Sequence, residues 1–232
     1  MKQKISQSYQ ALLQGFTDIG YDVRSIHDFQ TDKPHLILRH DVDICLHRAY
    51  KLAQIEAEIG HRSIYYILPS SPFYNILSIE NGDLVRKIAA LGHEIGLHLE
   101  LEGDADLQKK ADFEAGILSE ISQSPITSLS FHRPTANASK VKFTELELEG
   151  YLSAYNKSLF TDIAYVSDSR GAWHYGHPLK HEAVKNRTAM QLLTHPIWWT
   201  KDALCSPEED LTAIRAELDQ RNVAMMAETF KV

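Results

Sequence analysis

Cysteine is scarce in this sequence: Cys45 and Cys205 are the only two among 232 residues, and neither belongs to a CxxC pair. A disulfide-rich or zinc-finger scaffold is therefore excluded, and this cysteine usage is typical of a reducing compartment. The chain has no apolar run of about eighteen residues, so it predicts no membrane span. Residues 1–10 are polar and lack an apolar stretch, which predicts no secretory signal and a cytoplasmic location.

A surplus of positive charge is also missing. The chain has 24 Lys and Arg residues against 31 Asp and Glu residues, for a net charge of −7. This balance argues against nucleic acid and anionic membrane surfaces as partners. The hydrophobic fraction of 44% is sufficient for a core of normal size. Histidine, by contrast, is abundant, with 12 residues, and position must decide which of them take part in chemistry.

Apolar residues along the chain alternate between the spacing of strands and that of helices. The pattern predicts strands at 36–38, 63–68, 93–101, 128–131, 164–167 and 190–193, helices at 6–19, 46–59, 83–91, 106–121 and 207–220, and a last strand at Val223–Met226. No linker or repeat divides the sequence. We therefore expect one α/β domain over residues 1–232, with an N-terminal helical extension at 1–33, built on a parallel sheet or (β/α) barrel.

Polar residues cluster where the predicted strands end, beginning with the run RHDVD at 39–43. One carboxylate of the pair Asp41 and Asp43 can bind a metal ion while the other takes a proton from metal-activated water. Alternatively, Asp43 caps the helix that begins near Leu46, since aspartate is a favoured N-cap residue. A cap leaves the rest of the run unexplained.

The second cluster lies on the strand at 93–101. His98 and Glu100 share one face of this strand, and Glu102 lies just beyond it. Imidazole and carboxylate groups suit Zn²⁺ and other divalent metals, although an exposed polar strand face would give the same pattern. His93 lies on the opposite, apolar face, where we expect a hydrogen-bonded core histidine.

Three further clusters follow the strands at 128–131, 164–167 and 190–193; they contain His132 with Arg133, Asp168 ahead of an arginine and a tryptophan, and His195 ahead of Trp198 and Trp199. Each alone is explained by a basic surface loop, a β-turn or packed tryptophans. A histidine at a strand end can also act as a general acid. Five clusters at five strand ends would share one face of a β/α barrel, which favours an active site there.

In this order, the clusters resemble the motifs of polysaccharide deacetylases of the NodB-homology type (carbohydrate esterase family 4 and relatives). LRHDVD at 38–43 stands in place of the usual TFDDG, and ALGHEIGLH at 90–98 is similar to the second motif. FHRP at 131–134, SDSRGAW at 167–173 and LLTHP at 192–196 look like the third, fourth and fifth. The resemblance covers about residues 36–226. It implies a distorted (β/α) barrel of seven strands.

The resemblance further implies a bound divalent metal, most commonly Zn²⁺, and a role for each matching residue. Asp41 would be the general base, His195 the general acid, and Asp43 and His98 metal ligands. Arg133 and Asp168 would orient or tune the base and the acid.

The third metal ligand is open, because Glu102 stands where the family usually has a second metal-binding histidine. The candidates are His132, Glu100 and Glu102. We favour His132, since it lies at another strand end and imidazole is a good zinc ligand.

These features predict a metal-dependent hydrolase that removes an N-acyl group, above all N-acetyl, from an amino sugar or a surface-polysaccharide precursor. A cytoplasmic location would favour a nucleotide-linked or lipid-linked sugar as substrate. Two alternatives stay open: hydrolysis of a formyl or non-sugar amide, and a degenerate deacetylase domain that binds glycan without cleaving it. The sequence does not indicate an oligomeric state.

Overall fold

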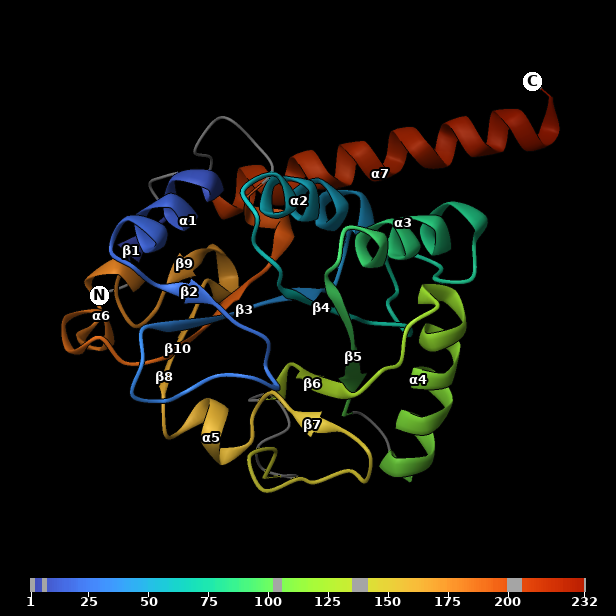
Figure 1. Cartoon of the computed structure of the whole chain (residues 1–232). Coiled ribbons are helices and arrows are strands. Elements are labelled where there is room, and N and C mark those ends of the chain that lie inside the picture. Colours follow the sequence, from blue (N-terminus) through green and yellow to red (C-terminus); the bar gives the residue numbers. More distant parts are fainter. Residues whose placement is uncertain (1–2, 6–7, 102–105, 135–141, 200–205, 232) are drawn as a thin grey trace.

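The computed structural model of the chain describes residues 3–5, 8–101, 106–134, 142–199 and 206–231 (Figure 1). Its main sheet follows the order β7-β6-β5-β4-β3-β10-β8, and β2 pairs with β3. The strands of this sheet are β2 (Asp22–Val23), β3 (His35–Val42), β4 (Ile64–Ile67), β5 (Glu94–Glu100), β6 (Ser128–His132), β7 (Leu152–Ser153), β8 (Ala164–Ser167) and β10 (Met190–Thr194). Every pairing among them is parallel, which confirms the predicted α/β class.

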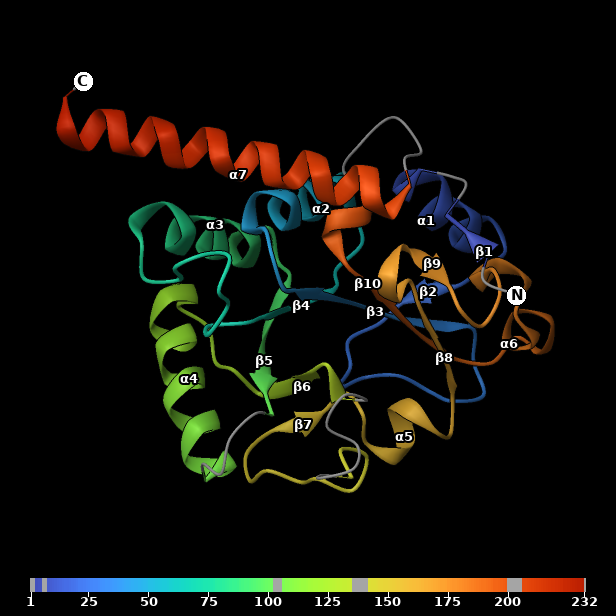
Figure 2. The ribbon, with the colours of Figure 1, turned by 180° about the vertical axis from the view of Figure 1, so that it is seen from behind.

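A small antiparallel pair and a set of helices complete the fold. The pair consists of β1 (Gln3–Lys4) and β9 (Ala172–Trp173). The helices are α1 (Tyr9–Asp18), α2 (Leu46–Glu58), α3 (Ile79–Ala90), α4 (Leu107–Ser122), α5 (Lys157–Phe160), α6 (Glu182–Asn186) and α7 (Pro207–Phe230), with short 3-10 turns η2 (Ser169–Gly171), η3 (Pro178–Lys180) and η4 (Pro196–Trp198). Figures 1 and 2 show α1 to α4 outside the sheet.

The seven-strand path is curled into a distorted barrel, as predicted. The guanidinium of Arg39 on β3 donates a hydrogen bond to the hydroxyl of Tyr155, just after β7, at 3.0 Å. Three strands, β4, β5 and β6, lie between β3 and β7, so a flat sheet would hold the two residues about 19 Å apart, four inter-strand spacings. The contact across the interior therefore requires the curl.

Alternation along β3 divides its side chains between the two faces of the sheet. Leu36 and Leu38 pack outward in one apolar cluster with Tyr9 and Leu12 of α1. Ile37 packs inward, in the cluster of the barrel interior. The predicted N-terminal extension thus contributes α1 to the core, because its apolar side covers β3.

The predicted strand at Val223–Met226 is wrong, since these residues lie inside α7. That helix starts with a capping box formed by Ser206 and Glu209 and runs for 24 residues. Between Glu208 and Phe230 no glycine or proline interrupts it, and the run is rich in Ala and Glu and also contains Leu, Met and Arg, all of which are good helix formers. A short apolar run cannot be assigned to a strand from its composition alone.

The parallel order brings the carboxyl ends of the strands to one edge of the barrel. The registers pair His40 with Thr194, Asp41 with Tyr66, and Glu100 with His132. The polar clusters of the sequence therefore lie on one edge, as predicted. Among the described residues, no helix is long and apolar enough to cross a bilayer.

Candidate active site

Asp41, the predicted base, lies on β3 and is 4% exposed. Its Oδ2 accepts a hydrogen bond from Nη2 of Arg39 at 2.9 Å, and its Oδ1 accepts a longer one from the Ser130 hydroxyl at 3.4 Å. Burial raises the pKa of Asp41, but the charge of Arg39, with smaller contributions from His98 and His195, outweighs it and lowers the pKa. The carboxylate is therefore ionised at neutral pH.

Arg39 is a site residue to which the sequence analysis gave no role. Its side chain is fully buried, with the guanidinium 5.3 Å from the ring centre of Tyr66 and 4.7 Å from that of Tyr155. It also donates a long hydrogen bond to Gln191 at 3.4 Å. The sequence could have predicted this contact, because residues two apart on a strand share a face and Arg39 precedes Asp41 by two positions.

Asp43 and His98 face each other beyond the end of β3. Asp43 Oδ1 lies 3.1 Å from Nε2 of His98, and it is buried without a well-formed hydrogen bond. Burial raises the pKa of Asp43, but His98, followed by His195 and His132, lowers it well below its usual range. Asp43 does not cap α2, whose N-cap is Cys45 with no side-chain capping bond.

This pair fits two ligand positions of a divalent metal. Ligand atoms about 2.0–2.2 Å from a tetrahedral zinc lie about 3.3 Å from one another, close to the 3.1 Å between Asp43 and His98. Nδ1 of His98 lies 2.6 Å from the Ser130 hydroxyl, which leaves Nε2 for the metal. Such a partner on the second nitrogen fixes the orientation of a metal-binding imidazole.

The third ligand is not settled by this geometry. His132 ends β6, its ring centre lies 5.3 Å from that of His98, and its Nδ1 lies 2.5 Å from Oε2 of Glu100. Glu100 is thus a partner of His132, and Glu102 lies outside the described residues. Across the described parts of the chain, no group of three or more His, Cys, Asp or Glu side chains is arranged as a complete metal site.

His195, the predicted acid, follows β10 and is held by Asp168, which follows β8. The carboxylate of Asp168 accepts from the His195 backbone N–H at 3.0 Å and lies 2.6 Å from Nδ1 of the ring. It also accepts from the indole of Trp199 at 2.6 Å. Nε2 of His195 lies 3.9 Å from Oδ2 of Asp43. Asp168 therefore makes the contact that its predicted role with the acid requires.

His195 is expected to titrate far above an ordinary histidine in the metal-free protein. Burial lowers its pKa, but Asp168 above all, with Asp43 and Asp41, raises it to about 9. The imidazolium thus stabilises the fold below about pH 6.5, and this contribution is lost as the pH rises through about 9. An NMR titration of the ring measures the midpoint, and Asp168→Asn should move it down. A wild-type midpoint near 6.5 would contradict the assignment.

Arg133 is placed differently from the other predicted residues. Its side chain is 62% exposed, and its recorded ion-pair partner is Glu100, at 3.9 Å. The contact with the base is made by Arg39 instead. A role for Arg133 toward the base or the substrate stays a prediction. His93, by contrast, is the buried core histidine that we expected, bonded to Ser63 and to the carbonyl of Ala53.

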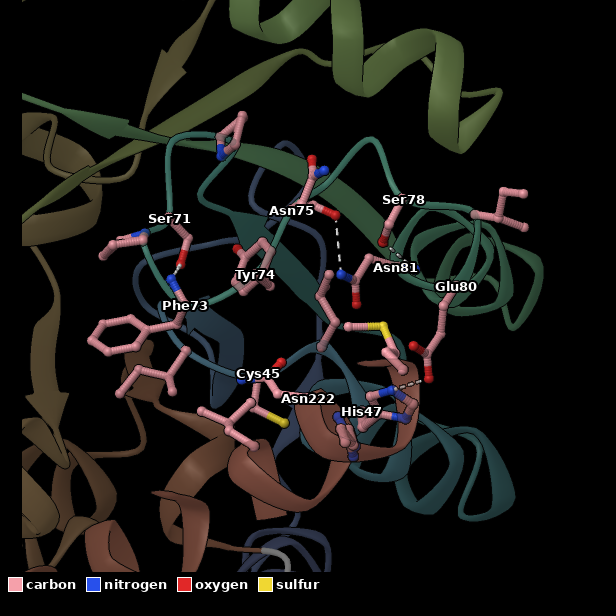
Figure 3. A pocket seen from close by; sticks show the side chains of 18 of the residues that line it. Cys45, His47, Ser71, Phe73, Tyr74, Asn75, Ser78, Glu80, Asn81 and Asn222 are labelled. Atoms are coloured by element: carbon pink, nitrogen blue, oxygen red, sulfur yellow. Dashed lines mark hydrogen bonds and ion pairs between the residues drawn. The ribbon is translucent and has the colours of Figure 1, made fainter. Parts of the chain in front are cut away.

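A groove of about 1230 Å³ is lined in part by Ile44 and Cys45, the two residues that follow Asp43 in the sequence (Figure 3). It lies between the start of α2, the segment 69–81 and the second half of α7, and its lining mixes amide, hydroxyl and aromatic side chains. The hydroxyl of Ser71 donates to the carbonyl of Asp43 at 2.7 Å, and that of Tyr74 to the carbonyl of Val42 at 2.7 Å. One wall of the groove is therefore fixed to the strand that carries the carboxylates.

Comparison with known proteins gives structural matches only. No protein-family model matches the sequence. No curated protein matches it significantly. A family 4 carbohydrate esterase from Bacillus anthracis has 13% identity and a TM-score of 0.45, over 96% of this chain and 91% of that chain. A family 4 acetyl xylan esterase from Clostridium thermocellum, in complex with a cobalt ion, has 14% identity and a TM-score of 0.42, over 80% and 84%.

A third solved structure is a family 4 pseudoenzyme from Bacillus anthracis, with 12% identity and a TM-score of 0.44, over 83% of this chain and 63% of that chain. Similarity this low does not by itself assign an activity, which must come from the residues of the site. The solved proteins to which this chain is similar thus include carbohydrate esterases of family 4, the family that its motifs resemble.

Proposed function

We propose that this protein is a metal-dependent deacetylase that hydrolyses an N-acyl group, above all N-acetyl, on an amino sugar. One observation carries the proposal: at a single edge of the barrel two carboxylates and two histidines meet, and three of them have dedicated buried partners. Arg39 holds Asp41, Ser130 holds His98, and Asp168 holds His195. A purely structural role would not require polar side chains to be oriented so specifically toward one point.

Asp43 and His98 would hold the metal, with His132 as the proposed third ligand. Held there, a divalent ion such as Zn²⁺ would supply Lewis-acid chemistry, namely activation of a water and polarisation of an acyl carbonyl. The residues suit this task, because Oδ1 of Asp43 is buried without a well-formed hydrogen bond and lies 3.1 Å from Nε2 of His98. We propose Zn²⁺ as this metal.

Asp41 and His195 would move the protons. Asp41 is ionised, so it can accept a proton from the attacking water, while Arg39 holds its Oδ2 in place. His195 is protonated below about pH 9 in the metal-free protein, and Asp168 occupies its Nδ1. Its Nε2 can therefore deliver a proton to the leaving amine as the C–N bond breaks, which releases the carboxylate and the free amino sugar.

The groove supports a substrate larger than a single sugar. Its lining includes Asn75, Asn81 and Asn222, together with the half-exposed ring of Phe73, and Ser71 in its wall bonds the backbone carbonyl of Asp43. Amide groups and an aromatic face suit hydroxyl-rich groups. We propose a nucleotide-linked or lipid-linked amino sugar, or another surface-polysaccharide precursor in the cytoplasm, as the substrate.

Release of acetate tests the function. The purified protein, loaded with Zn²⁺ or Co²⁺, is incubated with N-acetylglucosamine, its oligomers and a nucleotide-linked N-acetylglucosamine, and acetate and free amine are quantified. We expect activity that a chelator removes and that Asp43→Ala lacks.

Ser130→Ala keeps the proposed metal ligands but removes the hydroxyl that binds Nδ1 of His98, so the affinity for the metal, measured by metal titration, should fall about 10–100-fold.

Other outcomes point to the alternatives. Binding of these sugars without release of acetate, even with metal bound, would contradict the proposal and favour a glycan-binding domain without catalysis. Release of formate from an N-formyl substrate, with no acetate from any acetylated sugar, would indicate the formyl amide instead.

A further inference from the structure

The carboxylate of Glu56, on α2, lies fully buried behind the sheet at the centre of a polar network. Its Oε1 accepts hydrogen bonds from the hydroxyl of Tyr9 and from Nε2 of His40, the latter at 2.7 Å. Its Oε2 accepts from Ser63 at 2.5 Å and from Tyr65 at 2.9 Å. Both oxygens are thus fully used, and the carboxylate is a rigid anchor that joins α1, α2, β3 and β4.

His40 connects this anchor to the last residue of β10. Its Nδ1 lies 2.7 Å from the hydroxyl of Thr194, and the two residues are direct partners in the parallel pairing of β3 with β10. Both side chains are fully buried. A chain of hydrogen bonds therefore runs from Glu56 through His40 to Thr194.

This chain of hydrogen bonds ends directly behind the two proposed proton-transfer residues. Asp41 follows His40 in the sequence, and His195 follows Thr194. Because strand side chains alternate, His40 points toward the helices while Asp41 points into the barrel, where it meets Arg39. His40 and Glu56 are thus on the far side of the sheet, where they cannot touch a substrate.

His195 itself lies past the end of the regular strand, so strand pairing alone does not fix it. On the side of β8, Asp168 binds its backbone N–H and its ring. On the side of β3, the residue before His195 is held by a side-chain hydrogen bond between Thr194 and His40. The two bonds restrain the end of β10 from both neighbouring strands.

We propose that Thr194 and His40, anchored by Glu56, are positioning residues that hold His195 in register with Asp41 and Asp43. The inference rests on the deacetylase function proposed above. It explains why a carboxylate and an imidazole are retained in the core, where apolar side chains of similar size would avoid the cost of burying them.

Two substitutions at Thr194 test the proposal by kinetics. Thr194→Val keeps the shape of the side chain but removes the hydroxyl, and Thr194→Ser retains the hydroxyl as the matched control. We expect Thr194→Val to lower kcat for acetate release about 10–100-fold with little change in KM, because a small misplacement of a reacting group has effects of this size. Thr194→Ser should keep most of the wild-type kcat. A folded Thr194→Val with wild-type kcat would overturn the proposal.

A second measurement does not depend on activity. In the metal-free protein, the NMR signals of the His195 imidazole should shift in Thr194→Val and stay in place in Thr194→Ser. If the wild-type protein releases no acetate, the proposed function fails, while this comparison still decides the positioning role. If Thr194→Val does not fold, Glu56→Gln replaces it, and unchanged His195 signals there would overturn the proposal.

Discussion

Replacement of Asp41 by asparagine is expected to lower kcat for acetate release by about 10²–10⁴-fold. Asparagine keeps the shape of the side chain but cannot accept the proton of the attacking water at neutral pH. The metal pair of Asp43 and His98 does not involve Asp41 directly, so metal affinity should change far less than kcat. Steady-state kinetics and metal titration of the same preparation measure the two effects separately.

The same substitution should also destabilise the fold, because Arg39 would be left buried without its anionic partner. Breaking one side of a buried ion pair typically costs about 3–5 kcal/mol. A matched control separates the two effects: Asp41→Asn combined with Arg39→Met removes both charges and should recover much of the stability without recovering kcat. A folded Asp41→Asn protein with near-normal kcat would show that another group is the base.

Replacement of Arg39 by methionine alone should also destabilise the fold, by about 3–5 kcal/mol at neutral pH. Asp41 would then be buried without the cation of Arg39, which now offsets its desolvation and lies between the rings of Tyr66 and Tyr155. Methionine is close to arginine in length and fills the space between the rings, so the loss reports on charge more than on packing. Urea unfolding of the metal-free protein measures it.

The loss of stability in Arg39→Met should depend on pH in a defined direction. Arg39 is the main group that lowers the pKa of Asp41 against the effect of burial, and a lowered carboxyl pKa stabilises the fold above the unfolded-state pKa. Without Arg39, burial should raise the pKa of Asp41, so the variant should recover stability as this carboxylate is protonated. The difference in unfolding free energy between wild type and Arg39→Met should therefore shrink as the pH falls toward the unfolded-state value of about 4, and shrink further below it as wild type loses its own contribution. Arg39→Lys keeps the charge and should lie between the two. A loss in Arg39→Met that is independent of pH would mean that packing, not charge, explains it.

The local pattern of apolar and polar residues was sufficient to predict where the strands end and which polar residues cluster there. The period of two along β3 and β5 and the helical period of α2 and α4 depend on neighbours close in sequence, so these elements were predicted to within a few residues. The same pattern failed at Val223–Met226, because a short apolar run suits either a strand or a long helix, and the capping box at Ser206 starts a helix that nothing interrupts.

The partners of the site residues were not predictable in this way. Ser130 is a small polar residue inside an apolar strand, and only the pairing of β5 with β6 brings it to His98. Trp199 reads as a packing residue in sequence, yet its indole N–H binds Asp168. Arg133 and Asp168 were predicted to orient or tune the base and the acid, and the structure shows that the arginine in contact with Asp41 is Arg39, while Arg133 is largely exposed.

The sequence by itself determined the parallel α/β order, the edge at which the polar clusters lie and the candidate site residues Asp41, Asp43, His98, His132, Asp168 and His195. These depend on periodicity and on the chemistry of side chains, which are local properties. Only the tertiary structure decided the other partners: Ser130 on His98, Asp168 on His195 and Glu56 on His40. These contacts join residues 16 or more positions apart, so they depend on how the strands pair and on how α2 packs against β3.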